Sequence, residues 1–168
     1  MRRAALAAAL LCFAAPATAQ MPVWRDAVWT PPIDNWGTGL AYVCDNAGCP
    51  GGVTLLARTK VGFCNCFSGV ADDDEIDRIG DVDLHGDTFK PVEPGQPAAV
   101  GPLAGRKRAF QASGRWFGTS HVLSIVVATD CKAVVATLVS SAPITPSIEI
   151  AALALLGDKP FQKWAEAQ

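Results

Sequence analysis

The stretch VLSIVVATDCKAVVATLVS, residues 122–140, decides the fold that this sequence predicts. Its two runs, Val122–Ala128 and Ala133–Ser140, are almost continuously apolar and rich in β-branched residues, which is typical of strands. The four residues 129–132 separate the runs and predict the loop of a hairpin. Strands that are apolar on both faces are covered on both faces, so we expect this hairpin at the centre of a sheet.

The segment after the hairpin predicts two helices. Thr145 is a good N-cap in front of a proline, and Gly157 ends the first helix. The apolar residues between them follow the spacing of a buried stripe: Ile148, Ala151, Ala152 and Leu155. Asp158 then starts a second short helix, in which Phe161 and Trp164 lie three residues apart and face the domain together.

Residues 40–105 predict shorter elements. We expect strands at Leu40–Cys44, Val53–Thr59 and Val61–Phe67, with residues 60–62 as the join between the last two. A helix over residues 72–80 follows, because Asp72 is a good N-cap and three further acids lie in the first turn. The next segment, residues 86–105, is rich in glycine and proline and predicts a long connection, with one short strand at Phe89 and a longer strand, Arg106–Ala112, after it.

The sequence therefore predicts a single α+β domain over residues 40–168, with helices packed on an antiparallel sheet. Residues 40–68 carry four of its cysteines and are expected to form a disulfide-linked N-terminal subdomain. In front of the domain lies an extended arm, residues 20–39, which is rich in proline and tryptophan. We expect its tryptophans to dock the arm on its own domain, with a ligand-stacking platform as the alternative.

The first nineteen residues have the pattern of a secretory signal peptide. Arg2 and Arg3 precede the apolar run Ala4–Ala15, and Ala17-Thr18-Ala19 predicts cleavage before Gln20. The run is too short to span a bilayer, and no later stretch predicts a membrane span. We therefore expect a periplasmic or secreted protein, in a compartment where cysteines pair.

Five cysteines remain after cleavage: Cys44, Cys49, Cys64, Cys66 and Cys131. On a strand, Cys64 and Cys66 project from the same face about 6.5–7 Å apart, which is too far for a bridge between them. We expect structural disulfides that join Cys44 and Cys49 to Cys64 and Cys66, in either pairing. Cys131 is left as a candidate free thiol, as a replacement for one of the four, or as an intermolecular partner.

The charges are unevenly distributed along the chain, whose formal net charge is −2. Residues 72–87 hold eight acids and one base, whereas residues 106–115 hold four bases and no acid. We expect these segments to attract one another across the fold, the alternative being that one of them meets a charged partner. The acidic balance argues against a general nucleic-acid binder.

No residue stands out as catalytic, cofactor-binding or metal-binding. Residues 81–87 resemble a calcium loop but lack the acid at its last position. Ser120, His121 and Asp130 allow a triad on paper, without a nucleophile-elbow motif around the serine. The Cys64-Asn65-Cys66 segment binds copper or zinc only if its thiols stay reduced.

Residues Pro97–Ser140 resemble the second half of Mog1/PsbP-type domains. The likeness rests on residues 100–106 (VGPLAGR), the strand after them, the hairpin 122–140 and a closing helix. The resemblance covers about a third of the chain and implies an α/β/α sandwich with an antiparallel sheet. It also implies a binding or assembly role without catalysis, and it transfers no functional residue.

We therefore expect an exported, non-enzymatic binding or assembly protein with no cofactor and with a protein partner in the envelope. The alternatives are a small periplasmic hydrolase and a copper- or zinc-handling protein that uses Cys64 and Cys66. The sequence leaves open the ligand, the oligomeric state and the roles of residues 72–87 and 106–115.

Overall fold

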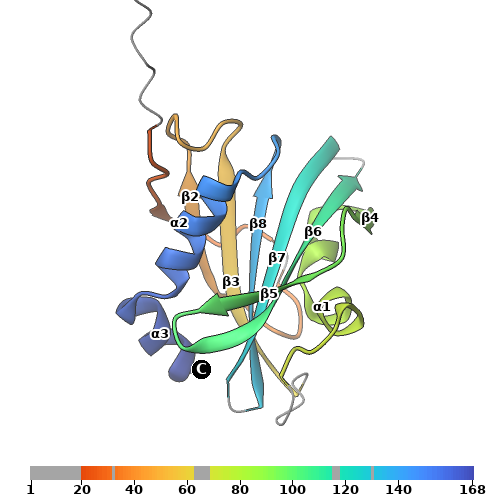
Figure 1. Ribbon diagram of the computed structural model, residues 1–168, viewed down its shortest axis with the longest axis vertical. Coiled ribbons are helices and arrows are strands. Elements are labelled where there is room, and N and C mark those ends of the chain that lie inside the picture. The colour runs from red at the N-terminus through yellow and green to blue at the C-terminus, as the bar shows by residue number, and fades with distance from the viewer. Residues whose placement is uncertain (1–19, 32, 63–68, 115–117, 130) are drawn as a thin grey trace, which may run out of the picture.

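The structure is a computed structural model that describes residues 20–31, 33–62, 69–114, 118–129 and 131–168. In these residues, eight strands form one antiparallel sheet (Figure 1): β1 (Arg25–Ala27), β2 (Leu40–Cys44), β3 (Val53–Val61), β4 (Thr88–Pro91), β5 (Gln96–Val100), β6 (Leu103–Gly114), β7 (Gly118–Thr129) and β8 (Lys132–Ser140). Helices in the same residues are α1 (Asp73–Ile79), the 3₁₀ helix η1 (Val82–His85), α2 (Pro146–Leu156) and α3 (Lys159–Glu166). The predicted α+β class is confirmed.

The predicted hairpin lies at the centre of the sheet. The strand order is β1-β2-β3-β8-β7-β6-β4, and β5 pairs with the part of β6 that β4 leaves uncovered. Thr129 pairs with Lys132, so the hairpin loop is two residues long and the predicted four-residue loop is wrong. β7 begins before the predicted strand, because its ladder with β6 continues through Gly118 and Thr119.

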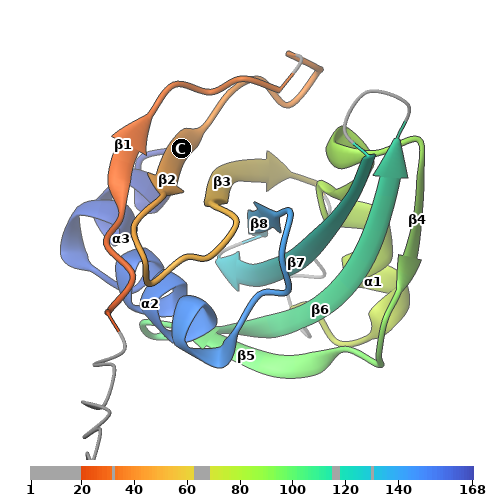
Figure 2. The same ribbon diagram turned by 90° about the horizontal axis from the view of Figure 1, so that it is seen from above.

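The two faces of the sheet are covered by different elements. On one face, here called the apolar face, α2 and α3 bury Ile148, Leu156 and Phe161 against β3, β7 and β8. On the other, here called the charged face, α1 and η1 cover the sheet through Ile79 and Val82. Figures 1 and 2 show the curved sheet with α2 and α3 on one side and α1 on the other.

The helices begin and end where the sequence predicts. The side chains of Asp72, Thr145 and Asp158 cap α1, α2 and α3. Gly80 ends α1 where the helix lies so close to β7 that a Cβ would be 2.7 Å from the Ser124 hydroxyl. The buried stripe of α2 differs in part from the prediction, because Leu156 is buried where Leu155 is only half-buried.

Two predictions for residues 53–105 are wrong. Strand β3 runs without a break through Lys60 to Val61, because the Lys60 side chain is buried in an ion pair with Asp81 on the charged face rather than exposed in a turn. The connection between η1 and β6 holds β5 as well as the predicted strand at Phe89. β5 pairs with β6 alone, and such an edge strand accommodates Pro97.

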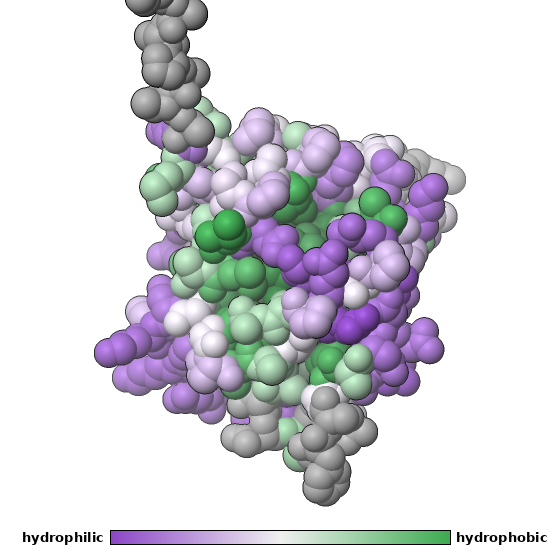
Figure 3. All heavy atoms as spheres, viewed as in Figure 1, coloured by the Kyte–Doolittle hydropathy of each residue, from purple (hydrophilic) through white to green (hydrophobic). Residues whose placement is uncertain are grey.

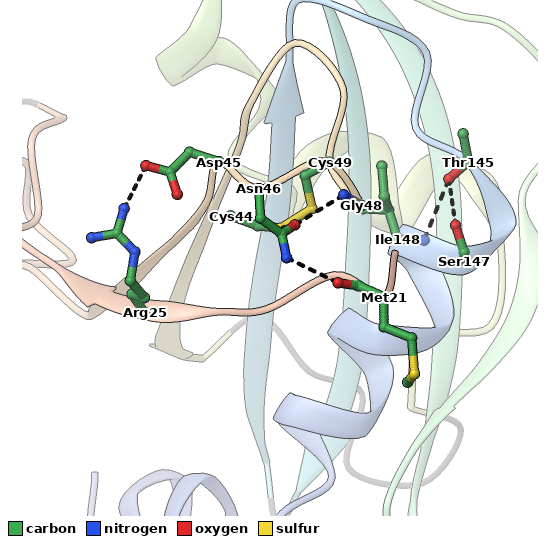
Figure 4. Close-up of a disulfide and its surroundings, with 10 residues drawn as sticks. All are labelled: Met21, Arg25, Cys44, Asp45, Asn46, Gly48, Cys49, Thr145, Ser147 and Ile148. Atoms are coloured by element: carbon green, nitrogen blue, oxygen red, sulfur yellow. Dashed lines mark hydrogen bonds and ion pairs between the residues drawn. A yellow bond between two sulfur atoms is a disulfide. The ribbon is translucent and has the colours of Figure 1, made fainter. Parts of the chain in front are cut away.

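The cysteine pairing also differs from the prediction. Cys44 and Cys49 are bonded to each other, with their Cα atoms 5.9 Å apart (Figure 4). Asn46 makes this short loop possible, because its side-chain oxygen accepts a hydrogen bond from the Gly48 N–H and turns the chain back on itself. Cys131 is disulfide-bonded, so it is not a free thiol.

Several sequence predictions lie outside the described residues. They are the signal peptide, residues 1–19, most of the strand Val61–Phe67, and the disulfides of Cys64 and Cys66. The segment 40–68 carries the Cys44–Cys49 disulfide and contributes β2 and β3 to the same sheet as the rest of the domain. None of the described helices has the length and apolar character that crossing a membrane requires.

The N-terminal arm docks on the domain, as predicted. β1 pairs with β2, and Trp24 packs against the core of the apolar face. The side-chain amide of Asn46 donates a hydrogen bond to the Met21 carbonyl and so ties the arm to the disulfide loop (Figure 4). Beyond β1 the arm crosses to the charged face, where the candidate site lies.

Candidate binding site

The acidic and basic segments of the sequence meet on the charged face. Arg106 on β6 donates from Nε to Asp73 on α1 at 2.7 Å, and Arg108 donates to both carboxylate oxygens of Asp77 at 2.8 Å. The pKa of Asp73 lies below its ordinary value because the Gly95 N–H and Arg106 both donate to its carboxylate. The predicted attraction between residues 72–87 and 106–115 is therefore confirmed as an internal contact.

A second group of charges joins the arm to the sheet, and all its members except Asp34 are buried. Arg58, Lys60, Asp34 and Asp81, here called the charged clamp, bring together β3, the arm and the start of η1. Arg58 is 1% exposed and Asp81 2% exposed. Charges buried to this extent persist only when they are paired and hydrogen-bonded.

Arg58 uses its whole guanidinium within the clamp. Two of its nitrogens donate to the two carboxylate oxygens of Asp81 at 2.8 and 2.7 Å, and both terminal nitrogens donate to Asp34 at 2.7 and 2.8 Å. A fifth donor reaches the Gly37 carbonyl at 3.0 Å. Because a guanidinium has five N–H groups, none is left over to bind a ligand.

Lys60 completes the clamp. Its ammonium lies 2.6 Å from Asp81 Oδ1, donates to the Ile79 carbonyl at 3.0 Å, and lies 5.8 Å from the centre of the Trp36 ring. The Arg58 guanidinium lies 5.6 Å from the centre of the Trp29 ring. The arm is therefore held by aromatic as well as ionic contacts.

The clamp also shifts the ionisation of its members. Burial opposes the charge of Arg58, but its hydrogen bonds with Asp81 and Asp34 outweigh that effect and raise its pKa. The hydrogen bonds from Arg58 lower the pKa of Asp34. Both groups are thus fixed in their charged forms, as expected for a structural ion pair.

An apolar pocket lies beside the clamp on the charged face. Thr54 and Leu56 form part of its wall, and they point to the same face as Arg58 because they precede it by four and two residues on β3. The pocket, here called the arm pocket, has a volume of about 310 Å³. Its lining residues come from the arm, β3, η1 and β8: Thr30, Pro31, Thr54, Leu56, Leu84, His85 and Val139.

His85 is the one ionisable residue among those that line the arm pocket. Its Nε2 atom is buried, and no group among the described residues hydrogen bonds to it. Burial lowers the pKa of His85 to about 4, although Asp81 and Asp83 favour the charged form. The imidazole is therefore neutral at neutral pH.

The catalytic and calcium arrangements weighed from the sequence do not assemble. Ser120 and His121 are neighbours on β7, so their side chains point to opposite faces, and Asp130 lies outside the described residues. The carboxylate of Asp81 is engaged by Arg58 and Lys60 instead of facing a cation site. Within the described residues, no group of His, Cys, Asp or Glu side chains is arranged to hold a metal ion.

Sequence reasoning missed the residues that matter at this site. Arg58 and Lys60 lie at alternate positions of an otherwise uncharged strand, and that pattern signals a charged pair on one face of a sheet. His85 lies among acidic residues, in the segment that resembles a calcium loop. No family model matches the chain, and no curated protein matches its sequence.

Proposed function

We propose that this chain is an exported, non-enzymatic binding or assembly protein. The observation that carries the proposal is the contrast between the charged clamp and the arm pocket beside it. Arg58 uses all its N–H donors within the charged clamp, whereas the adjoining arm pocket has a mainly apolar lining. An apolar cavity with few polar groups is the usual form of a small-ligand site.

The composition of the pocket favours binding over hydrolysis. His85 would need a nucleophile or an activated water and an acid to orient it. None of the residues that line the arm pocket is acidic, and Nε2 of His85 has no hydroxyl partner among the described residues. The resemblance to Mog1/PsbP-type domains supports the same proposal, since it implies a binding role.

Export is part of the proposal. The leader pattern supports it, and the Cys44–Cys49 disulfide is of the kind that persists in an oxidising compartment. Mass spectrometry of the protein from its natural host is expected to show a chain that begins at Gln20 and resists alkylation at Cys44 and Cys49 before reduction. A full-length, fully alkylated chain would overturn this part.

A protein partner in the envelope is the second candidate. Large apolar side chains are exposed along and beside β1: Met21, Val23, Val28 and Ile33 are 79%, 56%, 82% and 76% exposed. Capture from the envelope fraction should then depend on these residues. The test compares Val28→Asp with Val92→Asp, since Val92 is similarly exposed at 64% but lies between β4 and β5.

Native mass spectrometry of the folded protein from its natural compartment tests the proposal as a whole. We expect a bound small molecule, or a complex of fixed stoichiometry with another protein, that is lost on unfolding. Turnover of ester, amide or phosphate substrates that disappears in His85→Phe or His121→Phe would show an enzyme instead and overturn the proposal.

A further inference from the structure

We propose that Gln20 is a modification site, and that the mature chain begins with a pyroglutamate ring formed by this residue. The inference rests on the proposed export, because cleavage after Ala19 is what makes Gln20 the first residue. It goes beyond the proposed binding function, since it assigns a modified residue that neither the charged clamp nor the arm pocket includes.

The reaction needs no group outside Gln20 itself. The unprotonated α-amino nitrogen attacks the side-chain carbonyl carbon Cδ, a new C–N bond closes a lactam ring, and the bond from Cδ to the side-chain nitrogen breaks. That nitrogen leaves as ammonia with the proton that the amine gives up, so no oxidant or cofactor is consumed. α-Amino groups lose their proton near pH ~8, so roughly a tenth of them are in the reactive form at pH 7.

The side chain of Gln20 is free to react in the folded protein. Gln20 is exposed, and among the described residues no hydrogen bond or ion pair engages its amide. Gln162 shows the contrast, because its side-chain amide donates to the Leu156 carbonyl at 2.7 Å. Cyclisation of Gln20 therefore breaks no contact of the fold.

The backbone beside Gln20 is held by the disulfide loop (Figure 4). The Asn46 side chain donates to the Met21 carbonyl at 2.9 Å. A Cβ on Gly48 would lie 2.6 Å from the Gln20 carbonyl oxygen and 2.5 Å from the Met21 carbonyl carbon, so the absence of a side chain lets the loop pass this close. The reactive end thus lies next to a fixed point, and the ring forms without loosening the arm.

The ring changes the chemistry of the free end of the arm. It removes the positive charge of the α-amino group and the free amine that an aminopeptidase requires. Stepwise removal of residues from this end would release β1 and then Trp29 and Asp34, which contact Arg58. A blocked end therefore preserves the contacts of the charged clamp where peptidases are present.

The test follows the mass of the folded mature chain from a defined starting time. A fusion protein is cut directly before Gln20 with its disulfides oxidised, and intact-mass spectra are recorded over several days at neutral pH. We expect the chain to lose about 17 Da, the mass of ammonia, and to become resistant to sequential N-terminal degradation. Tandem spectra of the N-terminal peptide should place the loss at residue 20, and protein from its natural compartment should carry the same loss.

Variants separate the side chain of Gln20 from the rest of the chain. Gln20→Ala cannot form the ring and should keep its full mass. Gln96→Ala is the matched control, because it removes an exposed glutamine inside the chain and should lose ammonia as the natural sequence does. The same measurement in urea gives the rate of an unconstrained end, and the folded chain should react at a similar rate because Gln20 is exposed.

Two results would overturn the inference and leave the proposed export intact. One is a natural chain that begins at Gln20 with its full mass, and the other is a folded chain that keeps its ammonia while the unfolded chain loses it. Loss of ammonia from the N-terminal peptide of Gln20→Ala would also overturn it. Failure of export shows separately, as a natural protein that begins at Met1 although the released chain forms the ring.

Discussion

The two faces of the central sheet are stabilised in different ways. On the apolar face, side chains such as Leu55, Ile125 and Leu138 pack against α2 and α3. The stability of this face is the sum of many small van der Waals contacts. On the charged face, one guanidinium joins three segments that are far apart in the sequence, because Arg58 binds both Asp34 and Asp81. Figure 3 shows the side of the molecule that carries α2, where apolar residues gather in the middle and hydrophilic residues surround them.

This difference determines how each face responds to change. A truncation in an apolar core costs the transfer free energy of the removed atoms plus a term for the cavity, because neighbouring side chains relax only partly into the gap. Removing one member of a buried ion pair causes a large loss of stability, because the remaining charge is left buried without a partner. The charged face is therefore the more sensitive, and it is also the face that holds the arm pocket.

The largest effect is expected for Arg58→Ala. The substitution leaves Asp81, whose side chain is 3% exposed, with Lys60 as its only cation and releases Asp34 from the domain. We expect the free energy of unfolding to fall by about 3–5 kcal/mol. Denaturant unfolding followed by tryptophan fluorescence measures it.

Two further variants test this account of the charged face. The triple variant Arg58→Met, Lys60→Met and Asp81→Leu removes the buried charges together and should be more stable than Arg58→Ala. Arg25→Ala breaks the exposed Arg25–Asp45 ion pair and should have no measurable effect. A triple variant less stable than Arg58→Ala would contradict the account of the clamp.

Leu138→Ala is the corresponding change on the apolar face. Leu138 is fully buried on β8, and its truncation should cost about 3 kcal/mol through lost burial and the cavity left behind. Ile125→Val, on the neighbouring strand β7, should cost only about 1 kcal/mol. Equal losses from the two substitutions would show that the loss of stability on the apolar face does not depend on the number of atoms removed.

The same contrast explains which parts of the fold could be predicted. The central hairpin and the three caps are signalled by neighbouring residues, so Asp72, Thr145 and Asp158 were identified correctly. The clamp depends on residues 23 and 24 positions apart in the sequence, and no local pattern indicates which acid reaches Arg58. Lys60 was misread for this reason, since a lysine without its distant partner looks like a turn residue.

The candidate site was harder to predict than the fold. A strand pattern indicates which side chains share a face, but the arm pocket also needs Thr30 from the arm and His85 from η1. The cysteine pairing was wrong for a related reason. Face sharing on a predicted strand argued against a bond between Cys64 and Cys66 but says nothing of the turn at Asn46 that brings Cys44 to Cys49.

Removal of the Cys44–Cys49 disulfide should have a smaller effect than Arg58→Ala or Leu138→Ala. Both cysteines belong to the core of the apolar face, and the bridge closes a short loop with a sequence separation of 5. In the chain-entropy model such a loop contributes about 2 kcal/mol. We expect Cys44→Ala with Cys49→Ala to lower the free energy of unfolding by that amount. An unchanged thermal transition of the double variant would show that Asn46 and β2 hold the loop unaided.

The smallest effect concerns the pH dependence of the charged face. Hydrogen bonds from Arg58 lower the pKa of Asp34 below its ordinary value of 3.8, so the folded state favours the carboxylate. The stabilisation is fully present above pH ~5 and is lost as the pH falls through the pKa of folded Asp34. Asp34→Asn should therefore be less stable than the natural protein at neutral pH, by less than about 1 kcal/mol because the side chain is 36% exposed.

The difference between Asp34→Asn and the natural protein should shrink as the pH falls below about 4. Urea unfolding at a series of pH values measures it, with Asp74→Asn as a control for the loss of one exposed carboxylate outside the clamp. Leu138→Ala should show a loss that does not vary over the same range, because no titrating group is removed. If the Asp34→Asn curve runs parallel to that of the natural protein, Asp34 does not draw its stabilisation from Arg58, and the arm must be held by Trp29 and Trp36 instead.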